Sequence, residues 1–416
     1  MLVRRVLLAD ADAFFVEVAR QLDPDGAGRA QLLLVGGRPE QRGVVCSASY
    51  EARRRGVRSA MSMAQALRIC PEAMVVPVPR GACLKKSRAI ASVLERFAPV
   101  VAPASIDEWY LDLSGTERLY DQPLPETVRG MRAAVLREVG LPLSFGGGTN
   151  KLVAKLAVEL AKRPPPGVER GVHIVAPGEE AAFLTRFRLA DIPMVGPKLS
   201  ERLCSLGLQS VVDALPYNEA TLCGMLGERT GHWLFARIRG RCEDPVAQSE
   251  LARSIGKEST FPVDISLLDT TALHRELLAL LSQAAAELRR AGYVARTLTV
   301  KVKDADFTAR QRSHTLETAV ESERVLWPLA QSLLSELKAA RPGAIRLLGV
   351  SLSSLEPQGA RARPQASQLA LWGAEPRSEK KIPVETERDR VVAKLGDQIR
   401  ARFGEAALRP AQCLET

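Results

Sequence analysis

The sequence predicts a multidomain protein of mixed α+β class, and three observations support this prediction. The chain has 416 residues, which is too long for one hydrophobic core and indicates about two to four domains. Strand-like and helix-like patterns alternate as far as the prolines at 164–166, and a mostly helical stretch follows over 179–241. A second region of mixed strands and helices begins near residue 254.

Composition and charge limit the classes of function. Hydrophobic residues make up 46% and charged residues 25% of the chain, which excludes wholesale disorder. The net charge of +10 permits a polyanionic partner but does not require one. No apolar run approaches ~18 residues, so we expect no membrane span. The seven cysteines include no C-x-x-C pair and there are only four histidines, which argues against structural zinc and favours reduced thiols in a cytoplasmic protein.

The first elements are predicted to be a strand, a tight turn and a helix. The apolar run 6–9 ends at Asp10 and Asp12, and Phe14, Phe15 and Val18 then recur at helical spacing. Further patterns predict strands over 31–35 and 109–113 and one that ends at Pro103, and helices over 61–70, 86–97, 127–139 and, after Asn150 as N-cap, up to Lys162.

Beyond the prolines, residues 192–198 predict a glycine-containing hairpin between short helices. Such a hairpin can bind a DNA phosphate through its backbone amides, although the same pattern is also a common turn. The alternation over 297–303 predicts a half-exposed strand with Thr and Lys on one face. We also expect helices over 273–288 and 327–337, a strand over 345–352, a flexible segment over 358–381 and a short helix over 388–402.

Three acids carry the most chemical information. Adjacent acids in a regular strand point to opposite faces, so Asp107 and Glu108 can share a cation only at a hairpin tip, where the pattern puts them. Asp10 ends another strand, and if the two strands are neighbours the three carboxylates converge. Such hard oxygen ligands suit Mg²⁺, and two Mg²⁺ ions can clamp the oxygens of a phosphoryl transfer. Alternatively, Asp10 and Asp12 cap the following helix and Asp107-Glu108 is a solvated turn; spacing alone leaves both open.

Several motifs occur together in an order that closely resembles the Y-family, the translesion DNA polymerases. They are Asp10-Ala11-Asp12-Ala13-Phe14-Phe15, Ser47-Ala48-Ser49-Tyr50-Glu51-Ala52-Arg53, Ser105-Ile106-Asp107-Glu108, the N-K-x-x-A-K pattern that starts at Asn150, the hairpin 192–198 and the segment 254–261. The resemblance covers roughly residues 1–355, and it is the combination that is specific.

The resemblance implies a right-hand polymerase. The palm is expected over 1–20 and 78–167, the fingers over 21–77, a helical thumb with a helix-hairpin-helix over 168–241, a linker over 242–253, an α+β little finger over 254–355 and a flexible tail over 356–416. The implied activity is template-directed, low-fidelity translesion synthesis, in which dNTPs are added to a primer 3′-OH with two Mg²⁺ ions and without an intrinsic exonuclease. Implied partners are primer-template DNA, a dNTP and a sliding clamp, for a monomer that contacts no membrane.

Individual residues acquire expected roles from the same resemblance. Asp10, Asp107 and Glu108 are the expected catalytic metal ligands, with the backbone carbonyl of Ala11. Phe15 is the expected gate against a 2′-hydroxyl, although a core phenylalanine is the alternative. The other expected sites are Ser47, Tyr50, Arg53 and Lys162 for the nucleotide, Val195, Gly196, Lys198, Lys301 and Lys303 for DNA, and Gln368, Leu369, Leu371 and Trp372 for the clamp. For Arg53 a solvated basic turn, and for 368–372 an incidental apolar patch, are the alternatives.

The chain also departs from the family pattern. Trp109 stands where a small residue is usual, Met194 replaces the first glycine of the hairpin, Arg163 follows Lys162 where a proline is usual, and Gly146-Gly147-Gly148 replaces a more aliphatic strand. Two other functions remain to be weighed. A non-catalytic DNA-binding adaptor that recruits the clamp would need inert carboxylates, and a palm-type nucleotidyl cyclase would need neither the hairpin nor the little finger.

Overall fold

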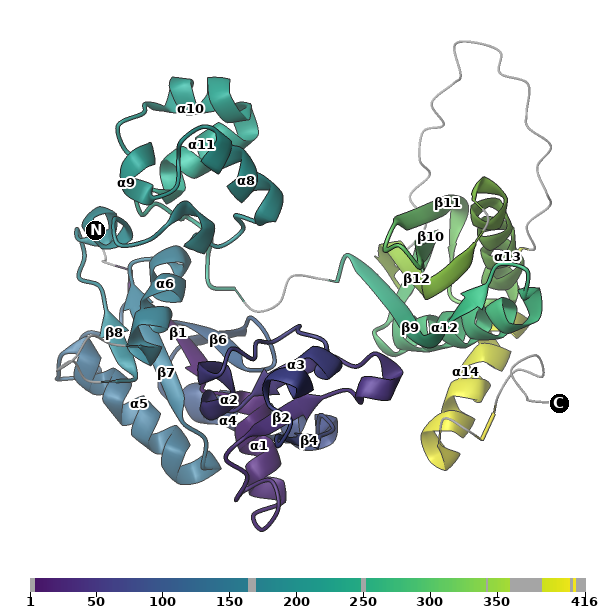
Figure 1. The fold of residues 1–416 in the computed structure, drawn as a ribbon, viewed down its shortest axis with the longest axis horizontal. Coiled ribbons are helices and arrows are strands. Elements are labelled where there is room, and N and C mark those ends of the chain that lie inside the picture. Colours follow the sequence, from purple (N-terminus) through teal and green to yellow (C-terminus); the bar gives the residue numbers. More distant parts are fainter. Residues whose placement is uncertain are drawn as a thin grey trace. The chain divides into compact units, whose positions relative to one another are not determined.

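The computed structural model describes residues 4–163, 170–247, 252–341, 343–359, 384–404 and 407–408. The chain forms two units (Figure 1). The first comprises Met1–Pro39 and Gly43–Glu250, and the second comprises Leu251–Thr416 with the short piece Glu40–Arg42. Within the described residues, no helix combines the length and apolar character that a membrane span requires.

A five-stranded sheet forms the centre of the first unit, in the order β5-β6-β1-β7-β8. Its strands are β1 (Val6–Ala11), β5 (Val100–Pro103), β6 (Glu108–Asp112), β7 (Leu143–Gly148) and β8 (Val172–Ile174). β1 lies between β6 and β7 and runs antiparallel to both, whereas β8 runs parallel to β7. The end of β1 therefore meets the β5–β6 hairpin.

Helices cover both faces of this sheet. On one face α1 (Phe14–Leu22), α4 (Arg80–Leu94) and α5 (Leu124–Val139) bury Phe14, Ile90 and Val135 against the sheet. On the other face α6 (Lys151–Lys162) buries Ala154 and Val158. Asn150 caps α6 as predicted, because its side-chain oxygen accepts the backbone N–H of Val153.

Two smaller parts complete the first unit. A three-stranded sheet in the order β3-β2-β4 packs with two short helices around a small core; these elements are β2 (Leu33–Gly36), β3 (Val45–Ala48), α2 (Tyr50–Arg54), α3 (Met63–Ile69) and β4 (Met74–Val76). The short 3₁₀ helix η1 (Pro39–Gln41) lies between β2 and β3, where the chain passes from one unit to the other. The second part is helical: α7 (Glu180–Leu184), η2 (Leu189–Asp191), α8 (Pro197–Ser205), α9 (Val211–Ala214), α10 (Glu219–Leu226) and α11 (Glu228–Arg237). The predicted helical stretch over 179–241 is thus confirmed.

The second unit is a four-stranded antiparallel sheet in the order β11-β10-β12-β9, covered on one face by two helices. Its elements are β9 (Ser254–Ser266), α12 (Thr270–Arg290), β10 (Tyr293–Asp304), β11 (Ala309–Val320), α13 (Glu323–Ala340), β12 (Ala344–Pro357) and α14 (Glu387–Phe403). The sequence pattern indicated β10, β12 and the helices, but β9 and β11 had no prediction of their own.

The last helix, α14, lies in a region that the sequence suggested would be a flexible tail. The helix expected over 388–402 is confirmed, and it is held to the second unit by polar contacts. Arg289 donates to Asp397, and the carboxylate of Glu385, just before α14, accepts the backbone N–H groups of Glu321 and Ser322. This part of the expected tail is therefore an ordered and attached helix.

Candidate active site

Two of the predicted metal ligands lie side by side on neighbouring strands. Asp10 of β1 is the register partner of Glu108 of β6, and the backbone N–H of Ala11 donates to the carbonyl of Asp107 at 2.9 Å. Asp107 lies at the tip of the β5–β6 hairpin, which the backbone N–H groups of Ala104 and Ser105 close by donating to the carbonyl of Glu108. The conditional expectation that the two strands are neighbours is confirmed.

The capping alternative for the acidic turn is wrong. Ala13, in a left-handed conformation, is the N-cap of α1, and no side chain caps that helix. Asp12 instead accepts a hydrogen bond from the hydroxyl of Ser144 on β7 at 2.9 Å. Asp12 is buried, and desolvation raises the pKa of its carboxyl group. Both acids of the turn thus point into the protein rather than along the helix axis.

Two lysines of α6 contact the carboxylates. Lys162 Nζ donates to Asp10 Oδ2 at 2.6 Å, and Lys155 Nζ donates to Glu108 Oε1 at 2.5 Å. The lysines are seven residues apart, which is two turns, so they share one face of α6. The side chains of Asp10 and Glu108 are 8% and 23% exposed, so each carboxylate meets its lysine in a largely enclosed setting.

Burial dominates the electrostatics of Asp10. Desolvation raises the pKa of this carboxyl group to about 7; the charge and hydrogen bond of Lys162 oppose the shift, and Glu108 adds to it. A buried carboxylate beside a second carboxylate is strained in the absence of cations. The corner formed by Asp10, Glu108 and the hairpin tip is therefore suited to binding positive charge.

The glycine strand explains why α6 lies close enough for these contacts. A Cβ atom on Gly146 would clash with the backbone nitrogen of Val158 and the carbonyl of Ala154 in α6, and a Cβ on Gly148 would lie 2.5 Å from a methyl carbon of Val153. All six residues of β7 are buried. Rather than loosening the strand, Gly146 and Gly148 let the helix approach the sheet, and α6 brings its lysines to the carboxylates; Gly147 faces the side chains of Ile174 and Leu7 instead.

Trp109 does not crowd the acids. It is the register partner of Ala9 and is 1% exposed, within the core formed by α1, α4 and α5. Glu108 and Trp109 are consecutive strand residues and so point to opposite faces. Small residues at Ala9 and Ala11 on the same side leave space for the indole ring. The large side chain is thus accommodated on the face opposite the carboxylates.

The predicted nucleotide-binding residues of the β2–β4 region lie together. Arg53 donates from Nε to the carbonyl of Ala48 at 2.9 Å and from Nη2 to the hydroxyl of Ser47 at 3.3 Å. Its guanidinium lies 5.5 Å from the centre of the Tyr50 ring, and that of Arg170 lies 5.1 Å from the same ring. Arg53 is therefore part of an ordered cluster and not a solvated turn.

Phe15, the expected gate, is more accessible than its neighbour Phe14. Phe14 is 2% exposed and belongs to the core, whereas Phe15 is only half-buried and packs edge-on against Phe14, with ring centres 5.6 Å apart. Phe15 and Tyr50 both border the small cluster that includes Val16 and Leu33. Phe14 is thus the core residue of the pair, and Phe15 is only partly enclosed.

The hairpin before α8 is a tight turn whose backbone N–H groups are hydrogen bonded within the turn. The backbone N–H of Val195 donates to Ile192, and that of Gly196 donates to Met194, so both amides are used inside the turn. Met194 is 85% exposed and has a φ of 76°, a left-handed conformation that favours glycine. Lys198, in the first turn of α8, is exposed and supplies positive charge at this end of the helix.

Lys301 and Lys303 lie on the sheet face of the second unit opposite the one that packs against α12 and α13. On this face Lys301 donates to Glu258 at 2.9 Å, and hydroxyl groups pair across β10 and β11: Thr297 with Thr315 at 3.0 Å and Thr299 with Ser313 at 2.9 Å. The predicted alternation of Thr and Lys on one face of the strand is thus confirmed.

The predicted clamp-binding residues, Gln368, Leu369, Leu371 and Trp372, lie outside the described residues.

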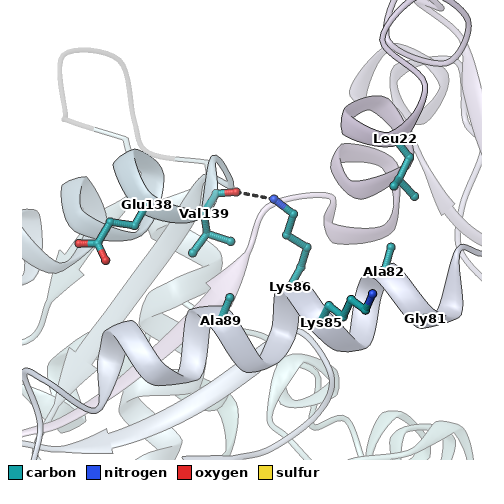
Figure 2. A pocket seen from close by; sticks show the side chains of 8 residues that line it. All are labelled: Leu22, Gly81, Ala82, Lys85, Lys86, Ala89, Glu138 and Val139. Atoms are coloured by element: carbon teal, nitrogen blue, oxygen red, sulfur yellow. Dashed lines mark hydrogen bonds between the residues drawn. The ribbon is translucent and has the colours of Figure 1, made fainter.

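A hollow of about 560 Å³ lies away from the carboxylates, where the ends of α1 and α5 meet α4 (Figure 2). Lys86 reaches across it to donate to the carbonyl of Val139 at 2.8 Å. These helices cover the sheet face opposite α6, so the hollow is separate from the acidic corner.

In the described part of the chain, no three Asp, Glu, His or Cys side chains form a ready metal cluster. Asp10 and Glu108 accept hydrogen bonds from lysines, and Asp107 accepts one from the hydroxyl of Ser105.

Two of the residues that the structure brings to the site had no role predicted from the sequence. Lys155 belongs to the N-K-x-x-A-K pattern, and its seven-residue spacing from Lys162 was the available signal that both could face the same strands. Arg170 follows the proline-rich segment, and no periodic pattern connected it with Tyr50. Lys155 could have been found from helical geometry, whereas the position of Arg170 is visible only in the structure.

Comparisons with known proteins agree with this geometry. Residues 9–159 match the model of the impB/mucB/samB family, and residues 252–367 match the C-terminal domain of the same family. A protein named DNA polymerase IV from Desulfatibacillum aliphaticivorans is 33% identical over 406 residues, covering 98% of this chain and 96% of that protein. Another protein of that name, from Halorhodospira halophila, is 36% identical over 356 residues, covering 85% of this chain and 96% of that protein.

Solved structures give the same result. A chimeric Y-family DNA polymerase, Dbh-Dpo4(243-245)-Dbh, matches with a TM-score of 0.71 and 25% identity over 85% of this chain and 100% of that one. DinB from Sulfolobus solfataricus matches with a TM-score of 0.54 and 25% identity over 84% of this chain and 98% of that one. The chain therefore belongs to the impB/mucB/samB family and is a translesion DNA polymerase of the Y-family.

Proposed function

We propose that the corner formed by Asp10, Asp107 and Glu108 is the metal centre of this polymerase and holds two Mg²⁺ ions. The observation that carries the proposal is the register pairing of Asp10 with Glu108 beside the hairpin tip that holds Asp107. The donor set fits, because carboxylates and the backbone carbonyl of Ala11 are the hard oxygen ligands that Mg²⁺ prefers. When bound, two such ions supply charge stabilisation to the attacking and leaving oxygens of phosphoryl transfer.

The incoming dNTP would bind beside this corner. Arg53, ordered by Ser47 and stacked near Tyr50, supplies a planar guanidinium that suits a phosphate, and Lys162 supplies a point charge from α6. Arg170, on the same tyrosine ring, adds a third positive charge to this region. The half-buried ring of Phe15 would pack under the sugar and exclude a 2′-hydroxyl, so that deoxynucleotides are selected by steric exclusion.

Primer-template DNA would be bound by both units. In the first unit Lys198 and the hairpin at Val195 and Gly196 would contact the backbone of the duplex, and in the second unit the open sheet face would do so through Lys301, Lys303 and its hydroxyl groups. These contacts are to phosphates, so we expect binding to weaken with salt. One solved relative is described as an insertion ternary complex of Dbh DNA polymerase, at 26% identity, which supports binding of DNA together with a nucleotide.

Residues 368–372 would bind a sliding clamp. An apolar peptide with a leading glutamine suits an apolar groove. The two described ends of the connection lie close together, because Gln358 and Glu385 both hydrogen bond to Glu321, through its side chain and its backbone N–H respectively. We further propose a monomeric cytoplasmic enzyme of low fidelity, without an exonuclease; the described cysteines are all free, as expected for a reducing compartment.

Primer extension with dNTPs and Mg²⁺ tests the proposed function. We expect the full chain to extend a primed template and the Asp107→Ala/Glu108→Ala variant to lose at least about 10³-fold in rate, because the loss removes most of the charge stabilisation of the transition state. DNA binding by the variant should stay close to that of the wild type. No extension by the wild type, with DNA binding intact, would favour the non-catalytic adaptor. In the same assay, Phe15→Leu should raise ribonucleotide insertion.

A further inference from the structure

The two lysines of α6 match the two acids of the corner one to one. Lys162 is bonded to Asp10 and Lys155 to Glu108, and each pair is a single N–H···O hydrogen bond between a flexible ammonium group and one carboxylate oxygen. Lys162 has an expected role toward the triphosphate, whereas Lys155 has no expected role. The pairing therefore raises the question of what two ammonium groups do where two divalent cations are proposed to bind.

The position of the lysines follows from backbone packing rather than from a chance side-chain conformation. The lack of a side chain at Gly146 lets the backbone of α6 lie against β7 at Ala154 and Val158. Lys155 is the next residue after Ala154, and its side chain is 29% exposed. The side chain of Lys162 is 22% exposed. Both ammonium groups are consequently directed at the acidic strand ends by a fixed helix.

Charge explains why these contacts exist in the substrate-free protein. Asp10 and Glu108 are adjacent carboxylates with little access to water, and such a pair needs compensating positive charge. One ammonium group on each acid provides it. A divalent ion bound by Asp10 Oδ2 or Glu108 Oε1 would lie next to an ammonium group that uses the same oxygen. The lysines and the metal ions cannot both occupy these oxygens without repulsion between like charges.

We propose that Lys155 and Lys162 are built-in counter-ions of the metal centre: they neutralise Glu108 and Asp10 while the centre lacks metal, and divalent ions must displace them. Lys155 is then a positioning residue, which keeps Glu108 at the corner but lowers the affinity of the corner for metal. This inference rests on the metal centre proposed above. It implies that metal and nucleotide binding reinforce each other, because a triphosphate that accepts Lys162 frees Asp10 for metal.

Binding of Mn²⁺ to the full chain without DNA or nucleotide, followed by electron paramagnetic resonance of the free ion, tests the proposal. We expect Lys155→Met to bind Mn²⁺ roughly tenfold more tightly than the wild type, since one positive charge a few ångströms from a carboxylate is typically worth at least one unit of pKa. Lys155→Arg keeps the charge and should bind as weakly as the wild type. If Lys155→Met fails to fold, Lys155→Gln makes the same test.

A matched control lies on the same helix. Lys151 is near the Tyr110 ring, 4.8 Å from its centre, and donates to the carbonyl of Pro245, so Lys151→Met removes the same charge from α6 without freeing a carboxylate. We expect it to leave the affinity for Mn²⁺ within about twofold of the wild type. Equal tightening by Lys151→Met and Lys155→Met, or no tightening by Lys155→Met, would overturn the counter-ion role.

The experiment separates this inference from the proposed function. Asp107→Asn/Glu108→Gln should abolish tight Mn²⁺ binding in both backgrounds. If it does not, the metal centre itself is misplaced. If these acids are required but Lys155→Met binds metal no more tightly than the wild type, only the counter-ion role fails and the polymerase site stands.

Discussion

Ion pairs with limited access to water occur in both units of this protein, and they are built differently. At the acidic corner of the first unit, two lysines each make one hydrogen bond to one carboxylate of the corner, and Lys162 makes a second one, 3.5 Å long, to the exposed side chain of Glu159. In the second unit Arg289, whose side chain is 3% exposed, donates to both oxygens of Asp397, to both oxygens of Glu323 and to the carbonyl of Glu321. All the guanidinium donors are thus used, whereas each lysine meets its acid of the corner through a single hydrogen bond, which a competing cation can replace.

The two types of pairing are suited to different tasks. A planar guanidinium between two carboxylates is geometrically specific. Burial lowers the pKa of Arg289, but the hydrogen bonds to Asp397 and Glu323, together with their charges, outweigh it and hold the pKa above the ordinary value of an arginine. This suits a permanent attachment, here the docking of α14. An ammonium group on a flexible chain is a point charge that can move to a phosphate or give way to a metal. The corner therefore needs lysines, and the attachment of α14 needs an arginine.

Arg289→Met should give the largest effect on stability. It leaves Glu323 and Asp397 without their shared cation, and breaking a buried pair from one side costs roughly 3–5 kcal/mol. Hydrogen–deuterium exchange of β10 and β12 amides reports the opening free energy of this unit alone. Arg324→Met is the control. It breaks a pair with Asp389 in which the arginine side chain is 70% exposed, and it should lower the opening free energy by less than about 1 kcal/mol. Equal costs would mean that the network around Arg289 has no special role.

Gly146→Ala should give the next largest effect, in the first unit. The new methyl group would meet backbone atoms of α6, which cannot move aside as a side chain can, and such overpacking costs roughly 1–3 kcal/mol. Displacing α6 also moves Lys155 and Lys162, so primer extension should fall. Gly130→Ala is the control, because Gly130 lies inside α5 with open space around it. This variant should raise the free energy of unfolding by about 0.5–1 kcal/mol in a thermal unfolding measurement. A neutral Gly146→Ala would show that the close approach of α6 is unnecessary.

The sequence predicted best where the signal is local. The α6 helix was expected from its period and from Asn150 as its cap, and both depend on residues within a few positions of each other. Strand β11 was missed because it is an edge strand on which most side chains are exposed, so the alternation of apolar and polar residues is absent. Its place is fixed by hydrogen bonding to β10, which no pattern within its own sequence records.

For the active site, residue types were predictable but their pairing was not. The three acids were found from strand ends and hairpin chemistry, and their convergence depended on β1 and β6 being neighbours, which is a property of the folded sheet. The side of the sheet that Trp109 would occupy depended on the same register. The partners of Lys155 and Arg289 lie 47 and 108 residues away in the chain, at Glu108 and Asp397 respectively. Contacts of this kind follow from tertiary packing alone.

The two units should also respond to pH in opposite directions. The pKa of Asp10 is raised from 3.8 to about 7, so the folded protein holds a proton that the unfolded chain releases, and the metal-free first unit should lose stability as pH rises from about 4 to 7. Asp389 accepts hydrogen bonds from Thr386 and Arg324, which lower its pKa to about 2, so the attachment of α14 should weaken as pH falls from about 4 to 2. Thermal unfolding across pH measures both, and Asp10→Asn and Asp389→Asn should each reduce one slope; buried Asp12, whose pKa is also raised, should retain part of the first.

Lys155→Met should give the smallest effect, and the only one that metal reverses. Its pair with Glu108 is partly exposed, so the metal-free variant should lose about 1 kcal/mol in the stability of the first unit. A ligand at about 100 times its Kd adds about 2.7 kcal/mol to the folded state, which exceeds this deficit. Because the variant is expected to bind Mn²⁺ more tightly, its unfolding temperature should rise faster with Mn²⁺ than that of the wild type, and the two curves should cross. Parallel curves would mean that Lys155 is a fixed partner of Glu108, as Arg289 is of Asp397, and the contrast between the two units would disappear.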